Sequence, residues 1–301
     1  MTAQDSATRA GPVAVTGGTL LAIAGVLAFS LTFPATVWGL ESFGPWSLVA
    51  IRGVLAALIA GGFLLALRVP FPERRHWGAF AVVASGVVLG FPMLTTLALG
   101  TSTTAHAAVV VGLLPLSTAA FSALRTGRRP SRTFWGAAFA GAAVVLAFTL
   151  QQSGGAVSTG DLYLFGALLV CAAGYTEGGR LARLMPGWHV IGWALVACLP
   201  LNLVVSAVAL SFEPVRLTAQ GVTGLVWVAA GSTFFGLYVW YRGMAAIGVE
   251  KASQLQLAQP LLTLVWSVPL LGERPGGGPP GGGGAPQRGP GGAPPAPPRG
   301  P

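Results

Sequence analysis

The chain alternates between long apolar runs and short polar breaks. Several runs extend for roughly 18–23 residues, which is the length that a helix needs to cross a hydrocarbon core of about 30 Å. The apolar residues within a run are continuous and do not alternate with polar ones, so they indicate helices and not barrel strands. We predict nine spans, at 18–40, 44–67, 77–99, 103–124, 133–150, 161–183, 188–210, 219–241 and 251–272.

The composition excludes water as the main solvent of this chain. Hydrophobic residues make up 53% and charged residues 8% of the 301 residues, whereas a soluble domain carries about 25% charged residues. Cys171 and Cys198 fall inside predicted spans, and we interpret them as small packing residues. Gly86 and Gly90 form a small-xxx-small pair, which predicts close helix packing. We therefore expect an all-α, polytopic membrane protein in contact with the lipid bilayer.

Positive charge is concentrated in every second loop. The eleven basic residues of these loops are Arg68, Arg74, Arg75, Arg125, Arg128, Arg129, Arg132, Arg180, Arg183, Arg242 and Lys251. The opposite loops hold only Arg216. By the positive-inside rule, the basic loops and the N-terminus are cytoplasmic, which predicts a multi-pass protein of the cell (plasma or inner) membrane.

The charge distribution also bears on targeting and partners. Residues 1–17 are polar and contain Asp5 and Arg9, so we expect a cytoplasmic N-terminal segment and not a cleavable signal peptide. The net charge is +9, but the basic residues form no continuous face, which argues against a nucleic-acid partner.

The fourth and ninth spans share an internal repeat. When they are aligned, Pro115 falls on Pro260 and Pro130 falls on Pro275, with the same separation of fifteen residues in both copies. The first span pairs in the same way with the sixth, through Gly-Thr-Leu at 18–20 and Gly-Asp-Leu at 160–162.

A repeat of five spans has an architectural consequence. Because the unit crosses the membrane an odd number of times, its second copy is inverted, as in many secondary transporters. We expect a first repeat at 18–150 and a second at 161–275.

The second repeat lacks its tenth span. Residues 276–301 contain only Gly, Pro, Ala, Arg and Gln, and 20 of these 26 residues are Gly or Pro. Proline removes backbone donors and neither residue favours a helix, so we expect no spanning helix there. Two explanations stay open, an out-of-frame reading of a GC-rich gene and a genuine disordered tail.

Three stretches of the chain resemble one known family. They are Phe33-Pro34-Ala35-Thr36 followed by Ser47-Leu48-Val49-Ala50-Ile51-Arg52, then Leu237-Tyr238-Val239-Trp240-Tyr241-Arg242-Gly243-Met244-Ala245, and finally Gln259-Pro260-Leu261-Leu262 running to Leu271-Gly272-Glu273-Arg274-Pro275. In order, spacing and duplication they resemble the EamA-type permeases of the drug/metabolite transporter superfamily, over residues 15–275.

This resemblance implies ten spans in two inverted five-helix halves around a central substrate pathway. It implies export or uptake of small organic metabolites, with amino acids and amines as the expected substrates. The missing tenth span departs from the family pattern. A homodimer is the assembly that we retain as a candidate.

Arg52 lies about eight residues into the second span, where a charge costs about 2.5–3.5 kcal/mol on insertion scales. One interpretation is a buried cation that faces the pathway and binds an anionic group of the substrate. The other is an arginine that clamps neighbouring carbonyls or reaches the near interface.

Two other titratable residues lie near span ends. Glu177 and Arg180 share one helix face at the predicted cytoplasmic end of the sixth span, which favours an interfacial ion pair. The sharper alternative is a proton-coupling carboxylate at Glu177. His106 begins the fourth span, where we favour an interfacial polar residue over a titrating one.

The ninth span carries three amides, Gln254, Gln256 and Gln259, directly before Pro260. Amides need partners inside a membrane, and proline frees backbone carbonyls that can line a cavity. We therefore place Gln256, Gln259 and Pro260 in the candidate substrate pathway, with interhelical hydrogen bonding as the alternative. Further kinks are expected at Pro34, Pro92, Pro115 and Pro200, of which we add Pro34 and Pro115 to the pathway.

Catalytic chemistry is not indicated. No Walker sequence is present, and His76, His106 and His189 have no metal-ligand spacing, so we expect no cofactor and no metal. We predict a secondary transporter that works by alternating access, driven by a proton or solute gradient. The main alternative is a non-transporting membrane scaffold, which would bury Arg52 and Gln256 against protein. A lipid-acting enzyme would need convergent catalytic groups that we do not find.

Overall fold

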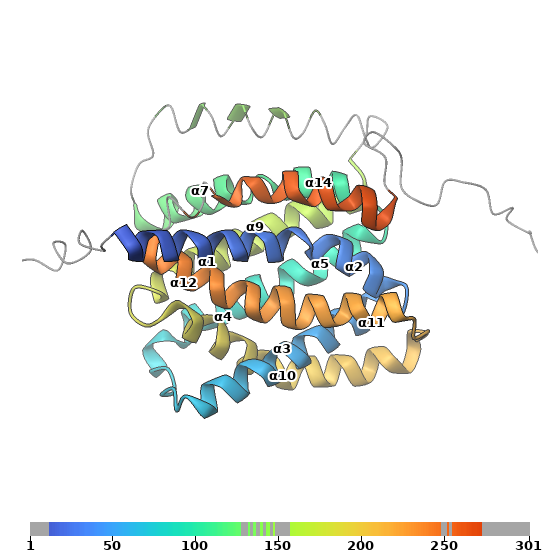
Figure 1. Cartoon of the computed structure of the whole chain (residues 1–301), viewed down its shortest axis with the longest axis horizontal. Coiled ribbons are helices and arrows are strands. Elements are labelled where there is room, and N and C mark those ends of the chain that lie inside the picture. The colour runs from blue at the N-terminus through green and yellow to red at the C-terminus, as the bar shows by residue number, and fades with distance from the viewer. Residues whose placement is uncertain are drawn as a thin grey trace, which may run out of the picture.

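The structure is a computed structural model that describes residues 12–127, 157–247 and 255–272, with Ala252 and scattered positions between 132 and 147. The described segments are helices joined by short turns and loops (Figure 1). The α-helices are α1 (Pro12–Ser30), α2 (Thr32–Leu40), α3 (Pro45–Ala66), α4 (Trp77–Val83), α5 (Phe91–Leu99), α6 (Thr104–Val111), α7 (Leu114–Thr126), α9 (Thr159–Leu181), α10 (Gly187–Phe212), α11 (Ala219–Val226), α12 (Leu237–Ile247) and α14 (Ala258–Leu271). The other elements are the 3-10 turn η1 (Arg74–His76) and the π-helical segments η2 (Ala84–Gly90) and η3 (Trp227–Gly236).

Consecutive elements join into stretches that can cross a membrane. Seven described stretches are long and apolar enough, namely Thr16–Leu40, Pro45–Ala66, Arg74–Leu99, Thr104–Arg125, Thr159–Leu181, Gly187–Phe212 and Ala219–Ile247. They coincide with predicted spans 1–4 and 6–8, and the shorter α14 lies within predicted span 9. The predicted fifth span and the tail lie outside the described residues, apart from scattered positions of the fifth span. An all-α, polytopic membrane fold is thereby confirmed.

Two spans break two or three residues before a proline that the sequence analysis singled out. Span 1 breaks at Leu31, between α1 and α2, and span 4 breaks at Gly112 and Leu113, between α6 and α7. The cause is local, because Pro34 and Pro115 have no N–H to donate to the carbonyl four residues earlier. By contrast, α10 continues through Pro200.

The π-helical segments occupy the middle of spans 3 and 8, and the sequence analysis did not predict them. In η3, the hydroxyl of Thr233 donates a hydrogen bond to the carbonyl of Val228, with a distance of 2.6 Å between the oxygens. A side chain that enters the helical ladder in this way displaces the regular pairing between residues four apart.

The contacts between spans 1–4 and spans 6–9 come in reciprocal pairs. Span 3 packs along α9 of span 6, and span 8 packs along α1 and α2 of span 1. At one edge of the bundle α3 lies along α10 (Figure 1), and on the other side α14 contacts α6. The contact of span 3 with span 6 corresponds to that of span 8 with span 1. The contacts of span 2 with span 7 and of span 4 with span 9 each correspond to themselves when the two halves are exchanged.

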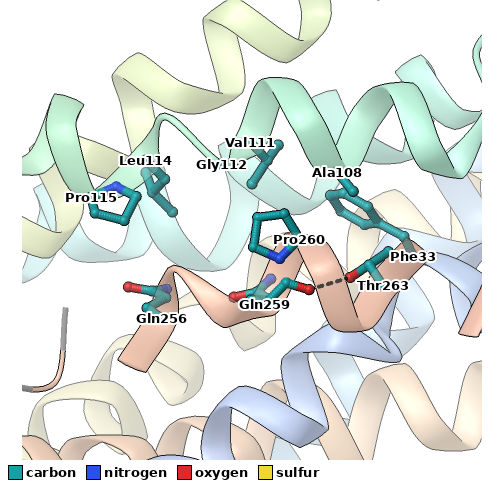
Figure 2. A pocket seen from close by; sticks show the side chains of 10 residues that line it. All are labelled: Phe33, Ala108, Val111, Gly112, Leu114, Pro115, Gln256, Gln259, Pro260 and Thr263. Carbon is teal, nitrogen blue, oxygen red and sulfur yellow. Dashed lines mark hydrogen bonds between the residues drawn. The ribbon is translucent and has the colours of Figure 1, made fainter. Parts of the chain in front are cut away.

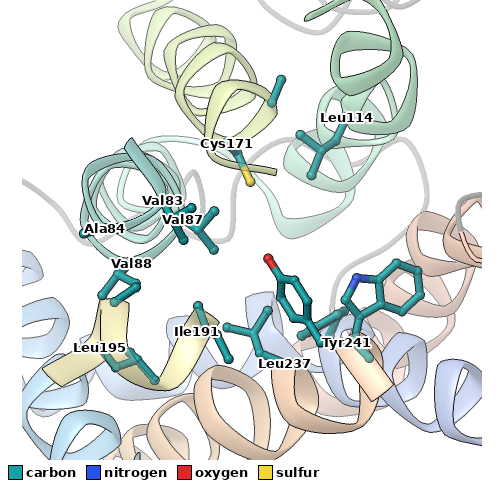
Figure 3. Close-up of a cluster of buried hydrophobic side chains, with 14 of the residues drawn as sticks. Val83, Ala84, Val87, Val88, Leu114, Cys171, Ile191, Leu195, Leu237 and Tyr241 are labelled. Carbon is teal, nitrogen blue, oxygen red and sulfur yellow. The ribbon is translucent and has the colours of Figure 1, made fainter. Parts of the chain in front are cut away.

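Small side chains allow the helices to approach closely. A Cβ added at Gly86 would overlap the carbonyl of Val170 on α9, which confirms the predicted close packing at this glycine. Val83, Cys171 and Tyr241 come from three different spans and meet in the buried core (Figure 3). Cys171 and Cys198 are buried free thiols, in agreement with their interpretation as packing residues.

The described arginines are unevenly distributed between the two ends of the bundle. We call the end that carries most of them the basic end; its members are Arg68, Arg74, Arg75, Arg125, Arg180, Arg183 and Arg242. Arg216 lies in the loop between α10 and α11, at the opposite end.

Candidate substrate pathway

A small cavity lies between spans 4 and 9. Four predicted pathway residues line it, namely Pro115, Gln256, Gln259 and Pro260 (Figure 2). The other lining residues are Phe33, Ala108, Val111, Gly112, Leu114 and Thr263. The cavity measures about 10 Å³, which is room for a single water molecule.

The local structure explains why these residues face one another. The break at Gly112 and Leu113 turns span 4 just before Pro115, and the ring of Pro260 lies close to Gly112 across the cavity. The two prolines that the internal repeat pairs therefore lie on opposite walls of one cavity (Figure 2). The amides of Gln256 and Gln259 supply its polar character, and Gln256 is buried.

Pro34 does not line this cavity. The carbonyl that it leaves unpaired, that of Ser30, is contacted by Thr263, which does line the cavity. In a regular helix the carbonyl of Ser30 would accept a hydrogen bond from residue 34, and proline cannot donate one. The hydroxyl of Thr263 on α14 lies 2.9 Å from this carbonyl and 3.0 Å from the carbonyl of Gln259 in its own helix, so its single proton is shared between the two acceptors. The indole of Trp266 donates to the hydroxyl of Ser30 at 3.0 Å. We call these two contacts the Ser30 latch, because they fasten span 9 to the break in span 1.

Arg52 lies away from the cavity, in α3. Its side chain is buried, and its guanidinium donates to the hydroxyl of Thr233 in η3 at 2.7 Å. Among the described residues, no carboxylate lies within 4 Å of this guanidinium. The arrangement places a buried cation between spans 2 and 8, on the same hydroxyl that distorts the helical ladder of η3.

Glu177 connects two helices at the basic end. One of its carboxylate oxygens accepts from Arg125 of α7 at 2.8 Å, and the other accepts from Arg180 of its own helix at 2.6 Å. The predicted ion pair with Arg180 is therefore present. The second arginine, from span 4, makes Glu177 a bridge between spans 4 and 6.

A second side-chain contact, which is buried, joins the opposite ends of the same two spans. Nε2 of His106, in the first turn of α6, lies 2.6 Å from a carboxylate oxygen of Asp161, in the first turn of α9. The other carboxylate oxygen of Asp161 accepts from the backbone and hydroxyl of Ser158 in a capping box. Spans 4 and 6 therefore run parallel and are joined near both ends.

The sequence analysis missed this contact because it singled out His106 without its partner. A signal was present, since Ser158-x-x-Asp161 before an apolar run is the pattern of a capping box. Gln254, Glu273 and Pro275 lie outside the described residues. Within the described part of the chain, no three His, Cys, Asp or Glu residues are placed to hold a metal ion.

The long apolar helices and their packing are those of a multi-pass membrane protein. A family model described as the EamA-like transporter family matches residues 16–150 and again residues 158–278. The chain belongs to this family, and through it to the drug/metabolite transporter superfamily.

Two bacterial proteins are similar to this chain in sequence. The "Uncharacterized transporter YdeK" of Bacillus subtilis (strain 168) is 43% identical over 264 residues, which cover 87% of this chain and 91% of that protein. An "Uncharacterized transporter" of Haemophilus influenzae is 25% identical over 148 residues, 45% of this chain and 81% of that protein.

A crystal structure shares the fold. It is similar with a TM-score of 0.62 and 22% sequence identity, over 86% of this chain and 91% of the solved chain.

Proposed function

We propose that this protein is a secondary transporter of the plasma or inner membrane that moves small organic metabolites, such as amino acids or amines, by alternating access. The N-terminus is on the cytoplasmic side in this proposal. The observation that carries it is the cavity between spans 4 and 9, where the repeat-related residues Pro115 and Pro260 meet beside two amides.

The size of the cavity supports alternating access over an open channel. A space for one water molecule holds no metabolite, so the substrate enters only when span 9 moves away from span 4. The breaks before Pro115 and near Pro260 are suited to this movement, because backbone pairing is already interrupted there. The Ser30 latch, the ion pairs of Glu177 and the hydrogen bond between His106 and Asp161 are the contacts that hold the closed form together.

The proposal assigns roles to the polar residues. Gln256 and Gln259 bind polar groups of the substrate, since their amides both donate and accept hydrogen bonds. Arg52 lies between spans 2 and 8, apart from the cavity, so it acts on an anionic group such as a carboxylate only through its charge, which has no carboxylate partner in the described residues. Glu177 is retained as a bridge and not as the proton-coupling residue, since two guanidiniums already neutralise its charge.

The test is flux of radiolabelled amino acids and amines into proteoliposomes, with and without an imposed pH gradient. We expect saturable flux in the wild type and at least a tenfold loss in Gln256→Met and Gln259→Met, which keep the side-chain volume but remove the amide. Leu261→Met, on the exposed face of the same helix, is the matched control and should transport normally.

The scaffold alternative predicts a different result. It expects no flux of any solute across a broad panel, although the protein is folded and inserted. If flux is unchanged in both glutamine variants, the substrate pathway does not run through the cavity between spans 4 and 9.

A further inference from the structure

A second and larger cavity lies on the outside of the bundle, between spans 3 and 7. This outer groove measures about 320 Å³, at the lower end of the range of about 300–1,000 Å³ for ligand pockets. Its lining residues are Phe71, Pro72, Trp77, Phe80, Ala81, Ala84, Trp193, Val196 and Ala197. Ala81 and Ala197 are exposed on the surface of their helices, so the groove opens sideways, towards the surrounding lipid.

Three aromatic rings form one end of the groove. The ring of Phe71, in the loop before η1, packs edge-on against Trp193 of α10, with ring centroids 4.8 Å apart. It also packs edge-on against Trp77 of α4, at 6.1 Å. An apolar space of this size matches an acyl chain.

The loop at this end of the groove is positively charged. Arg75 pairs with Glu73 at 2.8 Å, whereas Arg68 and Arg74 have no acidic partner in the described residues. The guanidinium of Arg74 lies 5.7 Å from the centre of the Trp77 ring, which is itself a wall of the groove. Arginine is the preferred partner of a phosphate group, because its planar donors match the phosphate oxygens.

We propose that the outer groove binds one anionic phospholipid of the surrounding membrane. One acyl chain lies along spans 3 and 7, and the phosphate lies at Arg74 and Arg68. The combination of an apolar groove with adjacent uncompensated arginines favours a lipid over a soluble anion, which has no chain to fill the groove. This site is separate from the transport cavity and does not depend on the proposed function.

The experiment measures lipid binding by native mass spectrometry of the delipidated full chain in mild detergent. The probes are phosphatidylglycerol and phosphatidylcholine with identical acyl chains. We expect phosphatidylglycerol to bind at least tenfold more tightly. Arg74→Gln and Arg68→Gln should each weaken it about fivefold, since each basic side chain near a lipid surface contributes about that factor.

Further variants separate the two parts of the site. Ala197→Phe fills the groove from an exposed position and should abolish tight binding, whereas Leu203→Phe, exposed on the same helix, should not change it. Arg216→Gln, at the opposite end of the bundle, is the control for charge. Equal binding of both lipids, or no effect of Arg74→Gln and Ala197→Phe, would overturn the proposal. Displacement of phosphatidylglycerol by an equal concentration of glycerol 3-phosphate would assign the arginines to a soluble anion instead.

Discussion

The substitution Thr263→Val tests the Ser30 latch between spans 9 and 1. Valine has nearly the same shape as threonine but cannot donate to the Ser30 carbonyl. Both residues are almost fully buried, with Thr263 2% and Ser30 0% exposed. Interhelical hydrogen bonds in membranes contribute about 0.6 kcal/mol on average and up to about 1.7 kcal/mol. A buried carbonyl that loses its partner costs about 1–3 kcal/mol. We therefore expect a destabilisation of about 1–2 kcal/mol.

The reasoning also predicts that this cost depends on Pro34. In Pro34→Ala the new backbone N–H can donate to Ser30 within the helix, so removal of the Thr263 hydroxyl no longer leaves the carbonyl unpaired. The double-mutant cycle should give a coupling free energy of about 1 kcal/mol, above the error of about 0.3–0.5 kcal/mol expected for independent sites.

The measurement is reversible unfolding in mixed micelles with increasing dodecyl sulfate, followed by far-UV circular dichroism. Trp266→Phe is the control, because this indole donates to the hydroxyl of Ser30 and not to its carbonyl. Its cost should be the same with Pro34 or Ala at that position. Equal costs of Thr263→Val in both backgrounds would refute the idea that proline creates the acceptor.

Three further predictions use the same unfolding assay. Gly86→Ala should destabilise the protein by about 1–3 kcal/mol, because the added carbon overlaps a neighbouring helix. Gly78→Ala, whose added carbon meets no atom within 4 Å, should be neutral or stabilising. Equal effects of the two substitutions would contradict the close approach at Gly86. Asp161→Asn should cost at least about 2 kcal/mol, because it weakens both a cap and a buried hydrogen bond to a carboxylate. Ser158→Ala should cost only about 1 kcal/mol. A reversed order would show that the contact with His106 adds little. Glu177→Gln should cost only about 1 kcal/mol of stability, since the arginine partners of Glu177 are 57% and 53% exposed. The variant should also keep any flux that is driven by a pH gradient. Loss of that flux in a folded variant would show that Glu177 is the coupling residue.

Those cavity residues that carry a local sequence signal could be predicted. Pro115 and Pro260 were found through the repeat, and Gln256 and Gln259 through the cost of amides within a span. All four line the same cavity. Thr263 was not predicted, because a threonine in an apolar helix has no distinguishing mark until a free carbonyl lies opposite it.

The contacts of Glu177 and Asp161 were less predictable, because most of their partners are distant in sequence. The pairing of Glu177 with Arg180 follows from helical spacing, which is local. Its second partner, Arg125, is 52 residues away in sequence, and the partner of Asp161 is 55 residues away. Only the parallel packing of spans 4 and 6 brings these side chains together.

By itself, the sequence determined the membrane environment, the positions of spans 1–4 and 6–8, and the breaks next to two prolines. These properties depend on hydrophobic length and on backbone donors within one segment, so they can be read without knowledge of neighbours. The tertiary structure decided which spans touch, that the Ser30 carbonyl is taken by Thr263, and that Arg52 lies on Thr233 apart from the cavity. Those outcomes depend on how closely small residues let helices approach, and in a bilayer nearly every outward-facing apolar residue is equally compatible with lipid or with another helix.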